Sequence, residues 1–229
     1  MKTNYLFVLI LLFILFGTSS CIFITDGTNN GFLNPTIWGS RNIISQNRSG
    51  AIFNAISCNG SMQVYIQQGN FYNINVRTDD NILQYLETTI ENNRLNIGFR
   101  RGFNVSPSLT EVYITTPTLR SVYLNGSGNV FGQGNINTDF LELVINGSGN
   151  MILNGFADYL RIGINGSGNM RTFGLNGRNA DVNITGSGDV ELSVSNELNA
   201  TIIGSGDIYY RGNPRLFLNI TGSGRVIRR

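Results

Sequence analysis

Apolar and polar residues alternate through the second half of the chain, and the alternation restarts at fixed intervals. The tripeptide Gly-Ser-Gly occurs six times there, and apolar side chains stand four and two residues before each copy. Another apolar side chain stands two residues after every copy. This alternation predicts strands with one buried face. The copies begin at Gly126, Gly147, Gly166, Gly186, Gly204 and Gly222.

The period of the tripeptide predicts the architecture. The steps between copies are 21, 19, 20, 18 and 18 residues, and such self-similarity is typical of stacked repeats. A coil of this length is too short for a strand–helix–strand crossover with its loops. It suits one turn of a β-solenoid, in which neighbouring coils pair in parallel at about 4.8 Å. We therefore expect an all-β protein, a parallel β-solenoid or β-helix, with regular coils over residues 119–229.

The tripeptide itself suits the corners of such coils. Glycine reaches positive φ without a Cβ penalty, and serine is small enough to stack at a crowded corner. Asparagine, threonine or aspartate usually flanks each copy, and these residues form turns. Their amides can bond along a ladder from coil to coil.

The first half of the domain is less regular. Turns are expected at Asn59-Gly60 and Gly69-Asn70 and, closing a hairpin, at Asn92-Asn93. Asp79 or Asp80 would cap a helical turn over residues 79–86. The strands expected here cover residues 52–57, 62–67, 72–77, 88–91, 95–99 and 111–115.

The N-terminus has the pattern of an export signal. Tyr5–Phe16 is an apolar run of 12 residues, too short to span a bilayer but suited to a signal-peptide core. The small residues before Cys21 look like a bacterial lipoprotein processing site, although Thr18 departs from the usual leucine. The resemblance implies a signal peptide over residues 1–20 and lipid on Cys21; the alternative is an ordinary secretory signal. The polar segment 21–49 would be a tether, ordered in part around Trp38.

Composition excludes several function classes. The chain has no histidine and a net charge of +2, and its only lysine is Lys2. Ser-His-Asp and Cys-His catalysis, histidine-ligated zinc and Schiff-base chemistry are therefore excluded, and nothing in the charge implies nucleic acid. No cofactor or metal is predicted. With Cys21 lipidated, Cys58 has no partner for a disulfide, and its apolar surroundings predict a buried thiol.

Two aspartates are candidates for chemistry. Asp189 and Asp207 occupy the same place in consecutive coils, about 5 Å apart after stacking, which is the carboxylate spacing of retaining glycosidases and could also hold Ca²⁺. However, asparagine stands at the same place in three other coils and Arg225 stands there in the last. A ladder of turn residues, with Arg225 offsetting Asp207, explains all six positions.

An aromatic and basic cluster near the C-terminus is the candidate binding surface. It comprises Tyr209, Tyr210 and Arg211, with Phe217 nearby. Aromatic rings can stack on sugars, but half of an alternating strand must face the core.

Several ordered blocks resemble one bacterial family. They are FNAIS from Phe53, VYIQQG from Val64, NVRTDDN from Asn75, LNI from Leu95 and VYITTPTL from Val112, followed by the Gly-Ser-Gly coils. Over residues 50–229 the chain is similar to the putative autotransporter-adhesin head domain, or GIN domain, family. The resemblance implies one all-β domain over residues 50–229, outside the cytoplasm, and brings no catalytic residues with it.

Together these patterns predict a non-catalytic, lipid-anchored protein of the bacterial cell envelope, exported to the surface or the periplasmic face of the outer membrane. It would act as an adhesin-like module that contacts glycans or envelope or host proteins over a long flank. One alternative is a carbohydrate-active β-helix enzyme with paired carboxylates. Another is a structural scaffold that forms homo-oligomers through its terminal coils.

Overall fold

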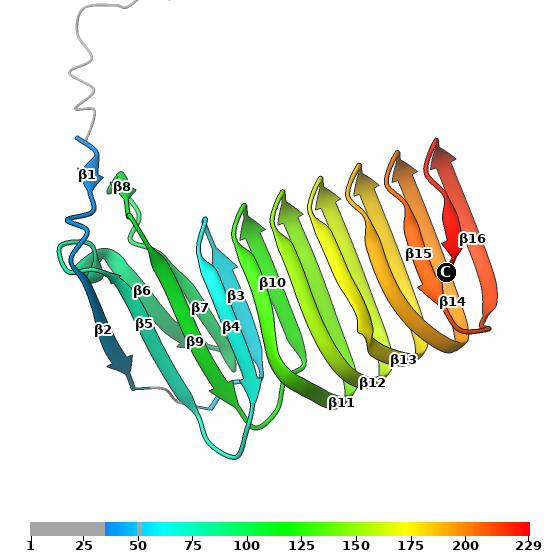
Figure 1. The fold of residues 1–229 in the computed structure, drawn as a ribbon, viewed down its shortest axis with the longest axis horizontal. Helices are drawn as coiled ribbons and strands as arrows, with labels where there is room; N and C mark the ends of the chain where they lie inside the picture. Colours follow the sequence, from blue (N-terminus) through cyan, green and yellow to red (C-terminus); the bar gives the residue numbers. More distant parts are fainter. Residues whose placement is uncertain (1–34, 50–51) are drawn as a thin grey trace, which may run out of the picture. The chain divides into compact units, whose positions relative to one another are not determined.

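The computed structural model describes residues 35–49 and 52–229, and most of them wind into a parallel β-solenoid (Figure 1). Strands of successive coils pair in parallel and in register, which confirms the predicted fold class. The expected signal peptide, Cys21 and tether residues 21–34 lie outside the described residues. The regular coils contain β10 (Ser121–Gly126), β11 (Asn129–Gly147), β12 (Asn150–Gly166), β13 (Asn169–Gly186), β14 (Val190–Gly204), β15 (Ile208–Arg211), β16 (Arg215–Gly222) and β17 (Val226–Arg228).

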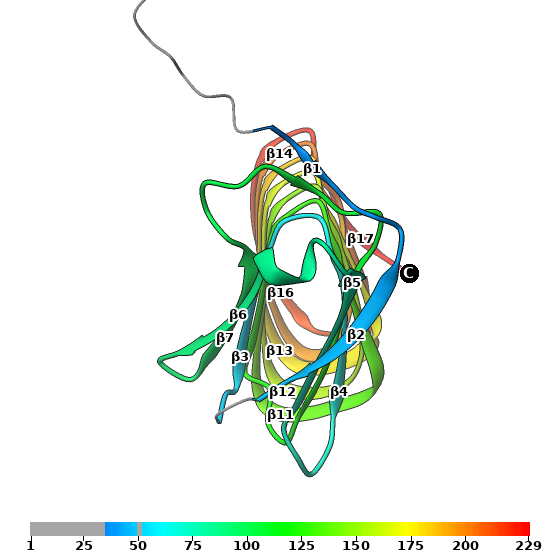
Figure 2. The same cartoon turned by 90° about the vertical axis from the view of Figure 1, so that its left-hand side faces the viewer.

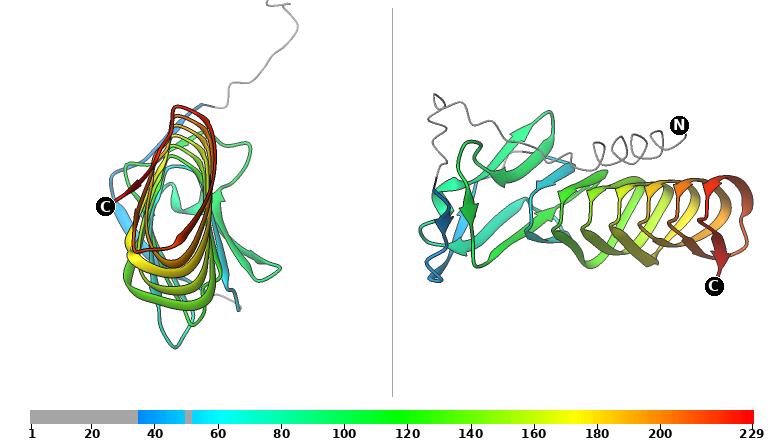
Figure 3. Two further views of the ribbon diagram at one scale, coloured as in Figure 1. Left: turned by 90° about the vertical axis from the view of Figure 1, so that its right-hand side faces the viewer. Right: turned by 90° about the horizontal axis from the view of Figure 1, so that it is seen from above.

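Each coil has two walls, seen end-on in Figures 2 and 3 as a flattened ring. A long strand such as β12 begins on one wall, bends where its register shifts, and continues on the other. The front wall contains β4 (Gln63–Gln68), the first parts of β11–β14, β15 and β17. The back wall contains β3 (Ala55–Asn59), β10, the second parts of β11–β14, and β16.

The two walls meet at the Gly-Ser-Gly corner. Glycine is required there because the backbones of two coils pass too closely for a side chain. Gly147 has φ +137°, and an added Cβ would overlap the carbonyl oxygen of Gly126. An added Cβ at Gly149 would overlap the carbonyl oxygen of Gly128. The close approach permits hydrogen bonding, since the Gly126 carbonyl accepts from the N–H groups of Ser148 and Gly149 at 3.1 and 3.2 Å. These paired bonds recur at each later corner.

Asparagine side chains form the predicted ladder beside the corner. Nδ2 of Asn146 donates to Oδ1 of Asn125 at 2.8 Å, and Asn165 donates to Asn146 in the same way at 2.8 Å. Asn125 donates to Asn59 at 2.9 Å. The ladder therefore begins one coil before the first complete tripeptide.

The turn expected at Asn59-Gly60 is this additional corner. The Gly60 N–H donates to the Asn125 carbonyl at 2.9 Å, and strands β3 and β4 lie on opposite walls instead of pairing with each other. Met62 stands where later corners have their second glycine. At a corner, the steric restriction falls on the residue of the later coil, whose Cβ would point at the carbonyl of the earlier coil. Gly128 is such a residue, since an added Cβ there would overlap the Met62 carbonyl, and Met62 itself can therefore carry a side chain.

Additional strands extend both walls beyond this first coil, mostly in antiparallel pairs (Figure 2). On the front wall the order β2-β5-β9-β4 adds β2 (Ile43–Arg48), β5 (Asn73–Asp79) and β9 (Thr110–Thr116). On the back wall the order β6-β7-β3 adds β6 (Leu86–Glu91) and β7 (Arg94–Phe99). The short elements are β1 (Ile37–Trp38), the 3-10 helix η1 (Leu83–Tyr85) and β8 (Val105–Ser106).

The predictions for this half hold in part. The hairpin through Asn92-Asn93 is confirmed, with φ +51° and +61° at the turn. The helical turn is present as η1, but the prediction that Asp79 or Asp80 caps it is wrong, because its N-cap is Ile82 without a side-chain bond. Residues 37–48, assigned to the tether, instead contribute β1 and β2. Strand β2 lies at a sheet edge with most of its side chains exposed, so it lacks the alternation that identifies a strand.

Asp79 joins the extra strands to one another. Its carboxylate is fully buried and accepts hydrogen bonds from the N–H of Arg41 at 2.6 Å and from the N–H and hydroxyl of Ser108 at 2.7 and 2.6 Å. Burial by itself would raise the pKa of this carboxyl, but the bonds from Ser108 and Arg41 outweigh it and hold the pKa below its ordinary value.

The core is one continuous column of apolar side chains between the walls. Cys58 lies in this column, fully buried, which confirms the predicted buried thiol, and burial raises the pKa of that thiol to about 12. In the last coil, Leu216, Leu218 and Ile220 keep the apolar pattern but are 40–47% exposed.

No helix among residues 35–49 and 52–229 is both long and apolar enough to cross a bilayer.

Replacing the second corner glycine, Gly149→Ala, should lower the free energy of unfolding by about 2–3 kcal/mol, because the methyl group would overlap a carbonyl in the preceding coil. Urea unfolding followed by circular dichroism measures the loss. The matched control is Gly163→Ala, whose added Cβ would meet Val144 at 3.6 Å, an ordinary contact. Equal unfolding midpoints for the two variants would contradict the corner model.

Asp79→Asn should cost about 2 kcal/mol at neutral pH, since a charged acceptor of three hydrogen bonds is lost. Because the folded pKa lies below the unfolded one, the carboxylate stabilises the fold above the unfolded pKa, and this stabilisation is lost as pH falls through the folded pKa. Urea unfolding near neutral and acidic pH should therefore show a smaller cost in acid. The control is Asp139→Asn at an exposed position, and a cost independent of pH would contradict the assignment.

Candidate functional site

The paired aspartates lie in a ladder of turn residues at the edge of the front wall. Nδ2 of Asn150 donates to Asn129 at 2.9 Å, and the N–H of Asp207 donates to Oδ1 of Asp189 at 2.8 Å. The N–H of Arg225 then donates to Oδ1 of Asp207 at 2.9 Å. The ladder that the sequence predicts is therefore present, and aspartate occupies it as an acceptor of backbone N–H groups.

Both oxygens of Asp207 are engaged. Oδ2 accepts from the guanidinium of Arg225 at 2.6 Å and from the hydroxyl of Tyr209 at 3.1 Å. The hydrogen bond from the Arg225 side chain holds the pKa of Asp207 below its ordinary value. A general acid needs a raised pKa, so the arrangement does not suit the acid of a glycosidase pair. Among the described residues, no group of three or more carboxylates or thiols is placed to hold a metal ion.

The aromatic and basic cluster is divided by the fold. Tyr210 faces the core and is 8% exposed, so its ring lies inside the solenoid. Phe217 lies on β16 of the back wall, whereas Tyr209 and Arg211 lie on β15 of the front wall. The expectation of a single cluster is wrong, because the chain crosses from one wall to the other between Arg211 and Arg215.

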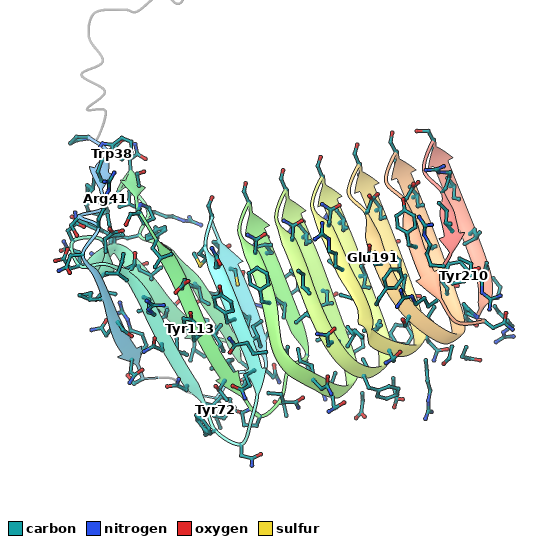
Figure 4. The ribbon with its side chains drawn as sticks, in the orientation of Figure 1. Trp38, Arg41, Tyr72, Tyr113, Glu191 and Tyr210 are labelled. Carbon is teal, nitrogen blue, oxygen red and sulfur yellow. The ribbon has the colours of Figure 1, made fainter. Side chains whose placement is uncertain are left out.

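Tyr209 and Arg211 instead line a shallow hollow of about 360 Å³ on the front wall, together with Phe173, Glu191 and Arg229. Glu191 on β14 pairs in register with Tyr209 on β15, and Figure 4 shows Glu191 on this wall. Phe173 and Glu191 were not singled out from the sequence, and Arg229 was not grouped with Tyr209 and Arg211. Aligning the coils at the tripeptide would have found them, since Glu191 and Tyr209 stand three residues after it, and Phe173, Arg211 and Arg229 stand five residues after it.

Two arginines in the hollow are held by rings. The guanidinium of Arg211 lies 4.1 Å from the ring centre of Phe173, and that of Arg229 lies 4.8 Å from the ring centre of Tyr209. Neither forms an ion pair with any described residue. The hydroxyl of Tyr209 donates to Asp207, which raises the pKa of the tyrosine and fixes its ring. The hollow therefore presents two oriented cations beside the carboxylate of Glu191.

The back wall also carries aromatic and charged residues, but they bind one another. The Tyr123 hydroxyl donates to Glu142, which lies 3.9 Å from Arg161, and Arg161 stacks on Phe140 at 5.5 Å. The Tyr159 hydroxyl donates to Asp181. These charged residues of β11, β12 and β13 on this wall are therefore engaged with neighbouring side chains, whereas the arginines of the front-wall hollow have no ion pair with a described residue.

Comparison with known proteins gives a family and a fold. A family model described as "putative auto-transporter adhesin, head GIN domain" matches residues 52–214. The structure is similar to that of a putative adhesin from Bacteroides fragilis, with TM-score 0.71 and 22% identity over 84% of this chain and 100% of that one.

Two further crystal structures share the fold. A putative adhesin from Parabacteroides merdae has TM-score 0.54 and 21% identity over 85% of this chain and 99% of that one. A putative lipid binding protein from Parabacteroides distasonis has TM-score 0.53 and 23% identity over 85% and 100%. A search of curated proteins finds no match.

The two aspartates of the ladder of turn residues, Asp189 and Asp207, should differ in their contribution to stability. Asp189→Asn should leave stability within about 0.5 kcal/mol, because asparagine Oδ1 can accept the same N–H, as Asn169 does in the preceding coil. Asp207→Asn should cost about 1–3 kcal/mol, because it weakens the bonds with Arg225 and Tyr209. Thermal unfolding of both variants measures the difference, and a larger loss for Asp189→Asn would contradict the ladder.

Proposed function

This chain belongs to the putative auto-transporter adhesin, head GIN domain family, and on that premise we propose that it is a non-catalytic, adhesin-like binding protein of the bacterial envelope. We propose further that lipid on Cys21 holds it at the outer membrane. The apolar run Tyr5–Phe16 and the small residues before Cys21 support export and lipidation.

The ligand that fits the front-wall hollow is an acidic glycan. The observation that carries this proposal is the pair of arginines, Arg211 and Arg229, fixed on aromatic rings and without ion-pair partners among the described residues. Guanidinium groups in fixed positions bind carboxylate or sulfate through charge-assisted hydrogen bonds. Glu191 adds an acceptor for sugar hydroxyls, and the open shape of the hollow suits a polymer that extends along the wall.

The double variant Arg211→Gln/Arg229→Gln should weaken binding to a polyuronate by at least tenfold, since losing one charge-assisted hydrogen bond costs about 1.5–3 kcal/mol. Titration calorimetry with polygalacturonate measures the change, and dextran serves as the neutral control polymer. Arg178→Gln is the matched control, because Arg178 is exposed and lies 3.5 Å from Asp158, outside the hollow.

Equal affinity of both variants for polygalacturonate would contradict a role for the hollow. Release of new reducing ends from the polymer, abolished by a carboxylate substitution, would contradict the non-catalytic assignment and favour the enzyme hypothesis.

Self-assembly is the second candidate, favoured by the exposed Leu216, Leu218 and Ile220 on β16. These side chains continue the apolar pattern that forms the core in earlier coils. Among the described strands β16 pairs only with β14, so its other edge is available to a second copy. Sedimentation velocity over a range of concentrations separates the candidates: a monomer throughout would contradict the scaffold hypothesis.

A further inference from the structure

The N-terminal end of the domain holds aromatic side chains outward. Trp38 on β1 is 71% exposed, and Phe103, in the loop before β8, is 45% exposed. The two strands form a small parallel ribbon, with the N–H of Ile37 donating to the Asn104 carbonyl at 2.8 Å and the N–H of Gly39 donating to the Ser106 carbonyl at 2.9 Å. Figure 4 shows Trp38 at this end of the solenoid, opposite Tyr210.

These exposed rings belong to ordered structure. The Trp38 carbonyl accepts from Nδ2 of Asn81 at 2.8 Å, and the hydroxyl of Ser40 donates to Asp80 at 2.5 Å. Phe103 packs on Tyr85 of η1, with 4.8 Å between ring centres. The fold therefore holds Trp38 in solvent, although burial of a large apolar side chain is worth about 1.5–3 kcal/mol.

The charges beside the rings are positive. Arg41 follows Trp38 by three residues and Arg101 precedes Phe103 by two; both are exposed, and neither forms an ion pair with any described residue. The acids at this end are engaged: Asp79 and Asp80 accept hydrogen bonds from the β1–β2 segment, and Glu87 pairs with Arg100 at 2.8 Å. Tryptophan beside unpaired arginine is the composition that favours a membrane interface with anionic headgroups.

The chain enters the domain at this same end. Pro35 lies three residues before Trp38, and Cys21 lies 14 residues before Pro35, a span of at most about 50 Å. The hollow on β15 lies at the far end of the front wall, where eight strand spacings from β2 amount to about 40 Å. A bilayer at the N-terminal end therefore leaves the hollow free.

We infer that Trp38, Phe103, Arg41 and Arg101 form a membrane-contact surface that seats the N-terminal end of the solenoid on an anionic lipid bilayer. The inference rests on the proposed lipid anchor for the proximity of the bilayer, and it adds a specific orientation. The aromatic rings enter the headgroup region, the two guanidinium groups meet lipid phosphates, and the solenoid axis rises from the surface.

The chain has a single tryptophan, so its fluorescence reports on Trp38 alone. The full lipidated chain is reconstituted into vesicles of phosphatidylethanolamine and phosphatidylglycerol, with and without lipids brominated near the headgroup end of the acyl chains. Trp38 emission should shift to shorter wavelength and be quenched by the brominated lipids. The control variant Trp38→Phe/Phe217→Trp moves the reporter to the far end, at a position 54% exposed, and should show neither effect.

Flotation separates this inference from the anchor. If the chain floats with vesicles but Trp38 is not quenched, the contact surface is overturned while the anchor stands. If the chain and Cys21→Ala float equally poorly, the anchor fails, and the inference is then tested by adding excess anionic vesicles to Cys21→Ala. An unshifted Trp38 emission there overturns it.

Substituting the arginines tests whether their charges bind the anionic headgroups. In the Cys21→Ala background, Arg41→Gln/Arg101→Gln should lower partitioning onto anionic vesicles by about tenfold to thirtyfold, and Phe103→Ser should reduce quenching. Circular dichroism verifies that each variant is folded. A blue shift that depends on protein concentration without lipid would show that a second copy covers Trp38, which overturns the assignment to lipid.

Discussion

The distance between coils at the Gly-Ser-Gly corner is the constraint on which the rest of this structure depends. At Gly149 the backbone lies so close to the Gly128 carbonyl that no side chain fits. The same proximity lets the Gly126 carbonyl bind two N–H groups of the next coil. Hydrogen bonds at the corner align successive coils, and this alignment places core side chains above one another, as in the row Leu143, Ile162 and Val182. The core column, the asparagine ladder and the aspartate ladder all follow from this register.

Stacking also decides what the surface offers to a ligand. Outward side chains at equivalent positions of successive coils form a row along the wall. Each side chain in such a row contacts the equivalent side chains of the neighbouring coils as well as solvent. On the back wall this leads to a network in which tyrosine, glutamate and arginine neutralise one another. On the front wall, Phe173, Glu191 and Arg211 from three successive coils line the hollow instead.

The two ends of the domain differ in a way that suits an oriented protein. Antiparallel strands, η1 and the buried carboxylate of Asp79 close the N-terminal end, while Trp38 stays exposed on an ordered ribbon. The hollow lies at the opposite end of the front wall. Contact with a membrane at one end and with a glycan at the other would use the full length of the solenoid.

The sequence by itself determined the coils, because residues within each coil repeat at a regular spacing that can be recognised without the structure. Alternating apolar positions, six tripeptides and the turn residues beside them were sufficient to predict the parallel solenoid, its asparagine ladder and the role of Asp189, Asp207 and Arg225 in one row. Each of these features repeats from coil to coil, so the same structural interpretation could be checked against several copies.

Only the tertiary structure decided the features that occur once. Asn59-Gly60 has the local signature of a turn, and its role as a corner depends on Asn125, far away in the sequence. Strand β2 is too polar to be recognised without its partner β5. The physical reason is that strand pairing assigns each side chain a face and a neighbour, and where no repeat exists that pairing cannot be inferred from the residues nearby.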